Sequence, residues 1–321
     1  MSGLPGAALP TEFSLIARHF RPLAGPGSLD LADDAAVLAV PPRRDLVISA
    51  DAIVAGVHFL EGDPPDLVGR KLLRVNLSDL AAMGAAPLGY LLTLAAPRGA
   101  GEGWFASLAA GLGSDQAAFG LVLLGGDTTA TDGPAVLSLT ILGHVAHGQA
   151  VRRAGARPGH GVWVTGTIGD GALGLRALRG EVADPDGFLA GRYRLPRPRL
   201  GFPLAAAAAA MDVSDGLVQD LGHLCRAGDV AAEIDAAAVP LSAAAIAAGP
   251  EWLATCLTGG DDYELLLAIP PEREAQLAAD AVRAGVPVTR IGRFVEGEPA
   301  VTVRDAAGAV MALDVGGWSH F

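Results

Sequence analysis

The order of apolar and polar positions predicts alternating strands and helices through the first half of the chain. Strands are expected where apolar runs end at turn residues, at 45–54, 88–97, 121–130 and 136–145. Helical spacing marks 12–23, 66–83 and 102–119. Gly84 is placed to end the second of these helices. The alternation predicts a domain of mixed α and β structure.

The second half has the same character. A strand and a glycine-rich turn are expected at 161–166, with helices near 171–180 and 199–210. The sequence MDVSDGL (211–217) predicts a short strand that meets a helix N-terminus, with Ser214 as the N-cap. Residues 257–270 predict a loop followed by a strand. Each half therefore contains an apolar strand, a Gly/Asp turn and a helix.

Chain length and one polar segment predict two domains. The 321 residues are about twice a typical domain length. The sequence RRAGARPGHG (152–161) is rich in Gly and Pro and has the composition of a linker. The expected organisation is a flexible N-terminal tail at 1–11, an N-terminal domain at 12–150 and a C-terminal α+β domain at 151–321.

Charge and cysteine content exclude several classes of protein. The formal net charge of −12 argues against a nucleic-acid surface or an anionic membrane surface. Apolar runs are interrupted well before 18 residues, and the N-terminus lacks the features of a signal peptide, so no membrane span is expected. Cys225 and Cys256 cannot form a disulfide framework or a four-cysteine zinc site, and a reducing cytoplasm fits them.

Aspartates recur in five short stretches, most of them where an apolar element meets a loop or helix. The stretches are LADDAAVL (31–38), VISADAIVAGVHF (47–59), NLSDLAAMGA (76–85), LLGGDTTAT (123–131) and MDVSDGL (211–217). Any one of them could be a helix cap or a strand start. Together they predict carboxylates that need cations, and hard oxygen ligands suit Mg²⁺. Several Mg²⁺ ions would turn an acidic pocket into a receptor for a polyphosphate.

Other phosphate-binding patterns are absent or ambiguous. The chain has no GxxxxGK[ST], no kinase HRD or DFG set and no HExxH. Gly169-x-Gly171-x-x-Gly174 matches a dinucleotide fingerprint in letters, but the acidic residue expected at the end of the next strand is missing. A tight strand-to-helix turn is the preferred interpretation. The GGD at 125–127 predicts a tight turn that could meet an anion, with a hairpin turn as the alternative.

The motifs together resemble the thiamine-monophosphate kinase family, in a wider group that includes aminoimidazole ribonucleotide synthetase and selenophosphate synthetase. The resemblance runs from residue 12 to the C-terminus and rests on EFSLIARHF, the DDAA turn, VAGVHF, VNLSDLAAMGA, GGDTT, VTGTIGD, DVSDGL, GGDDYEL and GGWSHF. It implies a two-domain α+β fold of the aminoimidazole ribonucleotide synthetase type. It also implies a homodimer in which the N-terminal domains pair strands, and ATP- and Mg²⁺-dependent phosphorylation of thiamine monophosphate to thiamine diphosphate.

The resemblance also implies roles for individual residues. Metal-binding positions are Asp34, Ser49, Asp51, Asp79, Asp127, Asp212 and Asp215. ATP contacts are Phe119, Gly126, Asp127, Arg153 and Ser214. Contacts to the thiamine phosphate are His58, Asp261 and Trp318. From the residues alone, His58 is equally interpreted as a buried histidine satisfied by backbone groups.

Four positions depart from the family pattern. Ala32 replaces the usual Gly before the acidic pair, Ala50 replaces a Thr before Asp51, and Asp261 replaces a longer Glu. Phe119 stands where the family often has a tyrosine. No covalent nucleophile is expected, because the acceptor phosphate oxygen would attack the γ-phosphorus of ATP directly. No general base is expected either, because the acceptor phosphate is already ionised near neutral pH.

Two other functions remain open at this point. One is another ATP-using enzyme of the same group, acting on a different acceptor. The other is a metal-stabilised dimeric scaffold that is not an enzyme, because its composition would look similar. His58 within VAGVHF and the terminal GGWSHF favour the thiamine branch.

Overall fold

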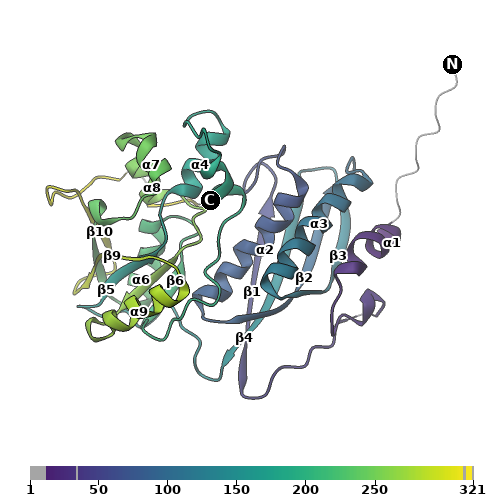
Figure 1. Cartoon of the computed structure of the whole chain (residues 1–321), viewed down its shortest axis with the longest axis horizontal. Coiled ribbons are helices and arrows are strands. Elements are labelled where there is room, and N and C mark those ends of the chain that lie inside the picture. Colours follow the sequence, from purple (N-terminus) through teal and green to yellow (C-terminus); the bar gives the residue numbers. More distant parts are fainter. Residues whose placement is uncertain (1–11, 34, 314–315, 320–321) are drawn as a thin grey trace. The chain divides into compact units, whose positions relative to one another are not determined.

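The computed structural model describes residues 12–33, 35–313 and 316–319 (Figure 1). Its internal contacts divide the chain into two compact units. The first takes its residues from 1–42, 48–76 and 87–143, and the second from 43–47, 77–86 and 144–321. The polar segment 152–161 is largely irregular and belongs to the second unit. The domain boundary expected between 150 and 151 stays a prediction.

The N-terminal segment is helical, as expected, but it is not one α-helix. It consists of α1 (Glu12–Leu15), a π-helical turn (Ile16–Phe20) and a 3₁₀ turn (Arg21–Leu23). Pro22 lacks the N–H that would continue an α-helical ladder, and its ring clashes with the preceding turn. The apolar spacing therefore predicts helical structure correctly, while the proline decides how that structure ends.

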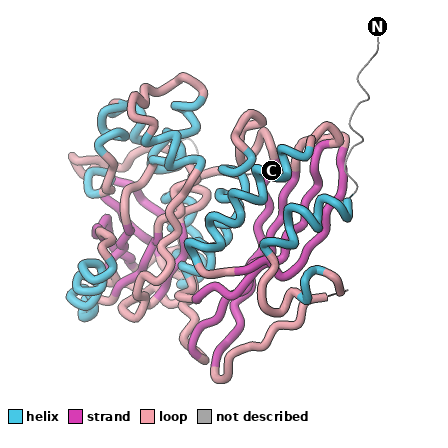
Figure 2. Tube along the Cα trace, turned by 45° about the vertical axis from the view of Figure 1, so that its right-hand side comes forward, coloured by secondary structure: helices cyan, strands magenta, loops and turns pink. Residues whose placement is uncertain are grey.

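The first sheet has four strands, and its order is β1-β4-β2-β3. The strands are β1 (Arg44–Val54), β2 (Ala86–Pro97), β3 (Val122–Thr131) and β4 (Val136–Ala146). The helices α2 (Pro65–Ala82) and α3 (Glu102–Phe119) lie on one face of this sheet (Figures 1 and 2). Along β2, Tyr90, Leu92 and Leu94 are buried while Leu91 is exposed, because successive strand residues point to opposite faces.

A buried ion pair fixes α3 against α2. Asp115 of α3 is fully buried and accepts hydrogen bonds from Arg70 Nε at 3.0 Å and Arg74 Nε at 2.6 Å. The Arg74 guanidinium also lies 5.6 Å from the centre of the Phe119 ring. A charge-assisted pair on a buried carboxylate is costly to break, so it sets how the two helices pack.

The strand β3 corrects one expectation. It does not stop at Gly125 and Gly126 but runs through both and pairs in parallel with β2. A Cβ on Gly126 would lie 1.8 Å from the carbonyl oxygen of Leu92. The two glycines therefore allow close approach of neighbouring strands, and the predicted tight turn at 125–127 is wrong.

The second unit contains a six-stranded sheet, whose order is β10-β7-β9-β5-β8-β6. The strands are β5 (Gly161–Thr165), β6 (Ala209–Asp212), β7 (Ala231–Asp235), β8 (Leu265–Ile269), β9 (Val288–Val295) and β10 (Val301–Arg304). The helices are α4 (Asp170–Leu178), α5 (Phe188–Arg194), α6 (Leu217–Gly228), α7 (Ala243–Ala248), α8 (Leu253–Thr258) and α9 (Glu274–Ala284). Short 3₁₀ turns occur at Leu29–Leu31, Ala236–Ala238, Pro250–Trp252 and Pro271–Arg273.

This sheet takes part in two separate hydrophobic cores. One core includes Leu217 and Leu221 of α6, and the other includes Leu277 and Ala281 of α9. The burial of β8 along its whole length follows from this arrangement, because a central strand between two cores exposes neither face. Its continuous apolar sequence, LLLAI, agrees with that position.

The helix expected at 199–210 is wrong. Residues 199–208 form turns and loop, and β6 begins at Ala209. Alanine favours helices, but this preference is weak, and Pro203 interrupts the segment. The pairing of Ala209 and Ala210 with β8 decides their conformation. The short α5 is an element that the apolar pattern missed.

Both cysteines are buried thiols, and the described helices are too short or too polar to cross a membrane. Cys225 and Cys256 are both free and buried. Burial raises the pKa of the Cys225 thiol to about 11 and that of Cys256 to about 12. Within the described ranges, none of the helices combines the length and the apolar character needed to cross a membrane.

Candidate active site

The residues expected at the site are divided between the two units. The first unit holds Ser49, Asp51, His58, Phe119, Gly126 and Asp127. The second holds Asp79, Arg153, Asp212, Ser214, Asp215, Asp261 and Trp318. Asp34 lies outside the described residues.

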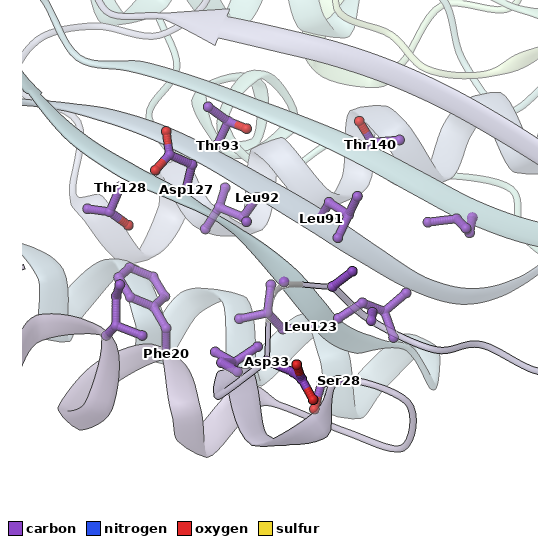
Figure 3. A pocket seen from close by; sticks show the side chains of 18 of the residues that line it. Phe20, Ser28, Asp33, Leu91, Leu92, Thr93, Leu123, Asp127, Thr128 and Thr140 are labelled. Atoms are coloured by element: carbon purple, nitrogen blue, oxygen red, sulfur yellow. The ribbon is translucent and has the colours of Figure 1, made fainter. Parts of the chain in front are cut away.

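A pocket of about 580 Å³ in the first unit contains Gly126 and Asp127. Asp127 of β3 pairs in register with Thr93 of β2. Figure 3 shows these two side chains next to each other, with Asp33 on the opposite side of the pocket. Most of the other lining residues are apolar, including Phe20. An apolar cavity with carboxylates at its edge suits a ligand that has an apolar part and a metal-bound anionic part.

Ser49 and Asp51 lie on β1, which is at the other edge of the same sheet from β3. Three strand spacings, about 14 Å, separate the two edges. The structure of a single chain therefore does not bring Asp51 and Asp127 within reach of one ion.

The backbone of Asp51 is held by a residue that the sequence pattern did not identify. Its N–H donates to Asn76 Oδ1 at 3.1 Å, and Asn76 Nδ2 donates to the Leu72 carbonyl at 2.9 Å. Asn76 is fully buried on α2. It belongs to the NLSDLAAMGA motif and lies three residues before Asp79, which is half-buried on the same helix. The signal available in the sequence was an asparagine between the apolar residues Val75 and Leu77, at the start of this motif.

His58 is held in a turn after β1. Its Nδ1 accepts the Val54 N–H at 3.1 Å, so the neutral ring carries its proton on Nε2. Its carbonyl oxygen accepts from Nζ of Lys71, the only lysine in the chain, at 2.8 Å. Lys71 is 1% exposed. The structure thus shows a histidine whose ring is bonded to a backbone group, as one interpretation expected. Contact of His58 with substrate stays a prediction.

Three loops meet at one edge of the six-stranded sheet. They follow β5, follow β6 and precede β8. Antiparallel pairing causes this, because Asp212 at the end of β6 is the partner of Leu265 at the start of β8. The Asp261 N–H donates to the Ser214 carbonyl at 2.9 Å. The pairing thus brings Asp212, Ser214, Asp215 and Asp261 to one place.

The turn at 213–216 is organised by Asp220, not by Ser214. Asp220 Oδ2 accepts the N–H groups of Ser214, Asp215 and Gly216 at 3.0, 3.0 and 3.1 Å. Burial, with the Asp215 charge as a second cause, raises the pKa of Asp220 to about 7. Gly216 is the N-cap of α6 and no side chain caps it, so the predicted Ser214 cap is wrong. A carboxylate in the first helical turn has reached back to the free N–H groups.

Residues 316–319, here called the C-terminal segment, reach the same turn. The Trp318 N–H donates to the Asp215 carbonyl at 2.9 Å, and Gln219 Nε2 donates to the Trp318 carbonyl at 2.6 Å. Trp318 is 52% exposed. Two residues expected at the site, Asp215 and Trp318, are therefore neighbours. Gln219 is a third member that sequence reasoning missed.

Arg153 is exposed on the segment that flanks β6. The carbonyl of the preceding Arg152 accepts the Ala210 N–H at 3.1 Å. Burial, followed by the charges of Arg226 and Arg153, lowers the pKa of His223 on α6. The backbone hydrogen bond from Ala210 to Arg152 thus holds the residue before Arg153 beside β6.

The glycine fingerprint at 169–174 is a structural turn, as expected. A Cβ on Gly169 would lie 2.4 Å from Cβ of Cys256, so close packing requires a glycine. The carboxylate of Asp262 accepts the N–H groups of Gly169 at 2.6 Å and Gly171 at 3.0 Å. Burial raises the pKa of Asp262 to about 8. The N-terminus of α4 is therefore occupied by a carboxylate of the chain itself, not by a pyrophosphate.

Glu264 of the GGDDYEL stretch is held by hydrogen bonds from other residues of the chain. It is fully buried and accepts from Thr165 Oγ1 at 2.7 Å, Arg199 Nε at 2.5 Å and Arg192 Nη2 at 3.1 Å. The three acidic residues of this stretch therefore differ. Asp261 lies half-buried at the loop edge with φ at 74°, whereas Asp262 and Glu264 hold the loop in place.

The donor chemistry fits Mg²⁺, although the described residues form no three-ligand cluster in advance. In the part of the chain that the structure describes, no group of three or more His, Cys, Asp or Glu side chains could hold a metal ion. Mg²⁺ commonly binds through only one or two carboxylates and takes its remaining ligands from water and substrate phosphates. Carboxylates placed singly, such as Asp127 on β3, or close together, such as Asp212 and Asp215 around one turn, are consistent with that mode.

Comparison with known proteins assigns both halves of the chain to one family. Residues 32–145 match the AIR synthase related protein N-terminal domain, and residues 157–304 match the C-terminal domain. The chain is 48% identical over 305 residues to the thiamine-monophosphate kinase of Caulobacter vibrioides, covering 92% of this chain and 87% of that protein.

Solved structures of thiamine-monophosphate kinases are similar to this chain over most of its length. The crystal structure of the Stenotrophomonas maltophilia thiamine-monophosphate kinase is 40% identical with a TM-score of 0.82, covering 91% of this chain and 96% of that one. A structure of AaThiL complexed with AMPPCP and TMP is 30% identical with a TM-score of 0.77, covering 97% of each chain. The two-domain α+β fold expected from the sequence is confirmed.

Proposed function

Because the chain belongs to the thiamine-monophosphate kinase family of AIR synthase related proteins, we propose that it uses ATP to phosphorylate thiamine monophosphate, forming thiamine diphosphate. The observation that carries this proposal is similarity over nearly the whole chain to AaThiL, which was solved in complex with AMPPCP and TMP. The sequence motifs at the site agree with it.

The proposed reaction is a direct in-line transfer. A phosphate oxygen of thiamine monophosphate forms a bond to the γ-phosphorus of ATP, and the bond from that phosphorus to the β,γ-bridging oxygen breaks to release ADP. Two anions must meet, so positioning and charge neutralisation are the main tasks of the protein. No residue is needed as a covalent nucleophile.

Seven residues are proposed to hold Mg²⁺: Asp34, Ser49, Asp51, Asp79, Asp127, Asp212 and Asp215. Bound Mg²⁺ would neutralise phosphate charge and orient the reacting oxygens. Hydroxyl and carboxylate oxygens are the ligand types that this ion prefers. Asp212 is 4% exposed at the end of β6, and Asp220 fixes the turn that follows it.

The remaining assignments concern ATP and the acceptor. Proposed ATP contacts are Phe119, Gly126, Asp127, Arg153 and Ser214, among which Arg153 offers a two-pronged phosphate contact. Proposed acceptor contacts are His58, Asp261 and Trp318. The exposed Trp318 indole can lie over the cationic thiazolium ring of thiamine.

We also propose a homodimer formed through the first unit, acting in the cytoplasm. Alternate positions of β1 and β2 expose apolar side chains, including Ile48 at 59% and Leu91 at 39%. Burial of such a surface by a second copy would be favourable.

Ile48→Asp should give monomers in sedimentation equilibrium, whereas Val282→Asp, at a position 84% exposed on α9, should stay dimeric. A dimeric Ile48→Asp protein would contradict this interface.

The decisive experiment is a coupled ADP-release assay with thiamine, thiamine monophosphate and other phosphate acceptors. The proposal requires ADP release that depends on thiamine monophosphate and Mg²⁺, with thiamine diphosphate as product. Release with a different acceptor would point to another enzyme of the group. No release with any acceptor, together with binding of metal alone, would support the scaffold.

A further inference from the structure

We propose that Gln219 is a positioning residue, which fixes Trp318 beside Asp215 so that the indole is ready to receive the acceptor. The inference rests on the proposed function, because that function gives Trp318 its role. Neither Gln219 nor its contact with the C-terminal segment is explained by the aspartate motifs. The structure links residues 99 positions apart through this one side chain.

The backbone of Trp318 is bound on both sides to one short stretch of the chain. Its carbonyl accepts from Gln219 Nε2 at 2.6 Å, and its N–H donates to the Asp215 carbonyl at 2.9 Å. Gln219 lies in the first turn of α6, which is anchored in the core through Leu217 and Leu221. Trp318 is 52% exposed, and these two hydrogen bonds fix both of its backbone polar groups. The rigid helix thus places a residue of the C-terminal segment.

The residue before Trp318 supports the same contact sterically. A Cβ on Gly317 would lie 2.4 Å from Cβ of Gln219 and 2.8 Å from the Asp215 carbonyl oxygen. Only a glycine lets the segment lie directly on α6 at this point. The close approach and the two hydrogen bonds concern the same four residues, so the segment is docked at a defined place.

Gln219 also connects the tryptophan to the acidic turn. Its Nε2 lies 3.4 Å from Asp215 Oδ2. The same Nε2 donates to the Trp318 carbonyl. The N–H of Asp215 is bound by Asp220, and its carbonyl is bound by Trp318. Both backbone groups of Asp215 are therefore fixed. The amide sets the distance between a proposed metal ligand and a proposed acceptor contact.

The test compares Gln219→Ala and Gln219→Met with Gln276→Ala. Gln276 is an exposed glutamine on α9, so its replacement controls for the loss of a helical glutamine. Methionine keeps the length of the side chain but cannot donate to the Trp318 carbonyl. Loss of a hydrogen bond worth about 1 kcal/mol corresponds to roughly a fivefold change in affinity. Both Gln219 variants should raise KM for thiamine monophosphate by roughly three- to tenfold and leave KM for ATP within about twofold.

A double-mutant cycle with Trp318→Ala separates positioning from a general effect on folding. If Gln219 acts through the indole, Gln219→Ala should add less than about twofold to KM for thiamine monophosphate once the indole is absent. Full additivity, or equal changes in both KM values, would overturn the proposal. Wild-type KM in Gln219→Met would also overturn it, because that variant keeps the bulk and lacks the donor.

Failure of this inference is distinguishable from failure of the proposed function. A wild-type chain that releases no ADP with thiamine monophosphate contradicts the function itself. An active wild type with Gln219→Ala behaving like Gln276→Ala contradicts only the role of Gln219. If Gln219→Ala does not fold, Gln219→Met gives the same comparison, because its side chain preserves packing on α6.

Discussion

At the scale of single residues, aspartates that look alike in the sequence have different tasks. Asp127 lies exposed in a pocket, whereas Asp220 and Asp262 are buried and accept backbone N–H groups. A carboxylate that binds N–H groups of the chain itself holds a turn, while one exposed in a pocket stays available for a cation. The difference lies in the surroundings of each side chain, not in its chemistry.

Asp212→Asn should abolish most activity without unfolding the protein. The substitution keeps the shape of a residue that is 4% exposed and removes the charge proposed to hold Mg²⁺. Turnover should fall by at least about a hundredfold, as expected when a strong electrostatic contact to the transition state is lost. Steady-state ADP release at saturating Mg²⁺ is the measurement. Asp229→Asn, at the exposed left-handed C-cap of α6, is the matched control, and near-normal kcat in Asp212→Asn would remove Asp212 from the site.

Asp262→Asn should change how stability depends on pH. Burial raises the pKa of Asp262 from its ordinary 3.8 to about 8, so between these values the folded state binds more protons than the unfolded state. Stability therefore falls as pH rises through this window, by up to about 1.4 kcal/mol per pH unit for one proton. The variant lacks this titration and should lose less stability between about pH 5 and about pH 8 in urea unfolding. Parallel pH curves for wild type and variant would show that Asp262 is not the group concerned.

At the scale of elements, long periodic segments are well predicted and glycine-rich ones are not. The helix expected at 102–119 is α3, with the same bounds. Judged by local sequence alone, the two glycines of β3 predict a turn. In the structure they lie within a paired strand. Their reason is the neighbouring carbonyl of Leu92, which only the pairing of β3 with β2 brings close.

Gly126→Ala should destabilise the first unit, and Gly125→Ala should not. A Cβ at 126 would meet the Leu92 carbonyl at 1.8 Å, whereas a Cβ at 125 would be in ordinary contact with Leu91 Cδ2 at 3.4 Å. Forcing the strands apart should lower the free energy of unfolding by roughly 1–3 kcal/mol. Urea denaturation of both ligand-free variants measures this. Equal stability of the two would mean that β2 and β3 are not paired in the register described.

At the scale of the whole molecule, charge and ligand binding are linked. The chain carries a formal net charge of −12, and acidic site residues occur in both compact units. A polyphosphate is repelled by such a surface unless cations accompany it. The proposed function therefore requires metal ions to accompany the nucleotide into an acidic site.

Thermal unfolding should show this dependence directly. Mg²⁺ with ATP at a hundredfold excess over its Kd should raise the midpoint by at least about 5 °C, whereas ATP in EDTA or Mg²⁺ alone should produce a smaller shift. Asp127→Asn should reduce the combined shift, because one proposed metal ligand is lost. The full shift with Mg²⁺ alone would instead support a metal-stabilised scaffold.

The sequence by itself determined the α+β class, the positions of most long elements and the gathering of aspartates in a few short motifs. These follow from local periodicity and turn chemistry, which need no knowledge of distant residues. The docking of Trp318 on Gln219, the return of Asp220 to its own turn and the passage of β3 through two glycines were decided by tertiary structure. Each depends on which backbone N–H or carbonyl group is brought near by folding, and a linear pattern does not contain that information.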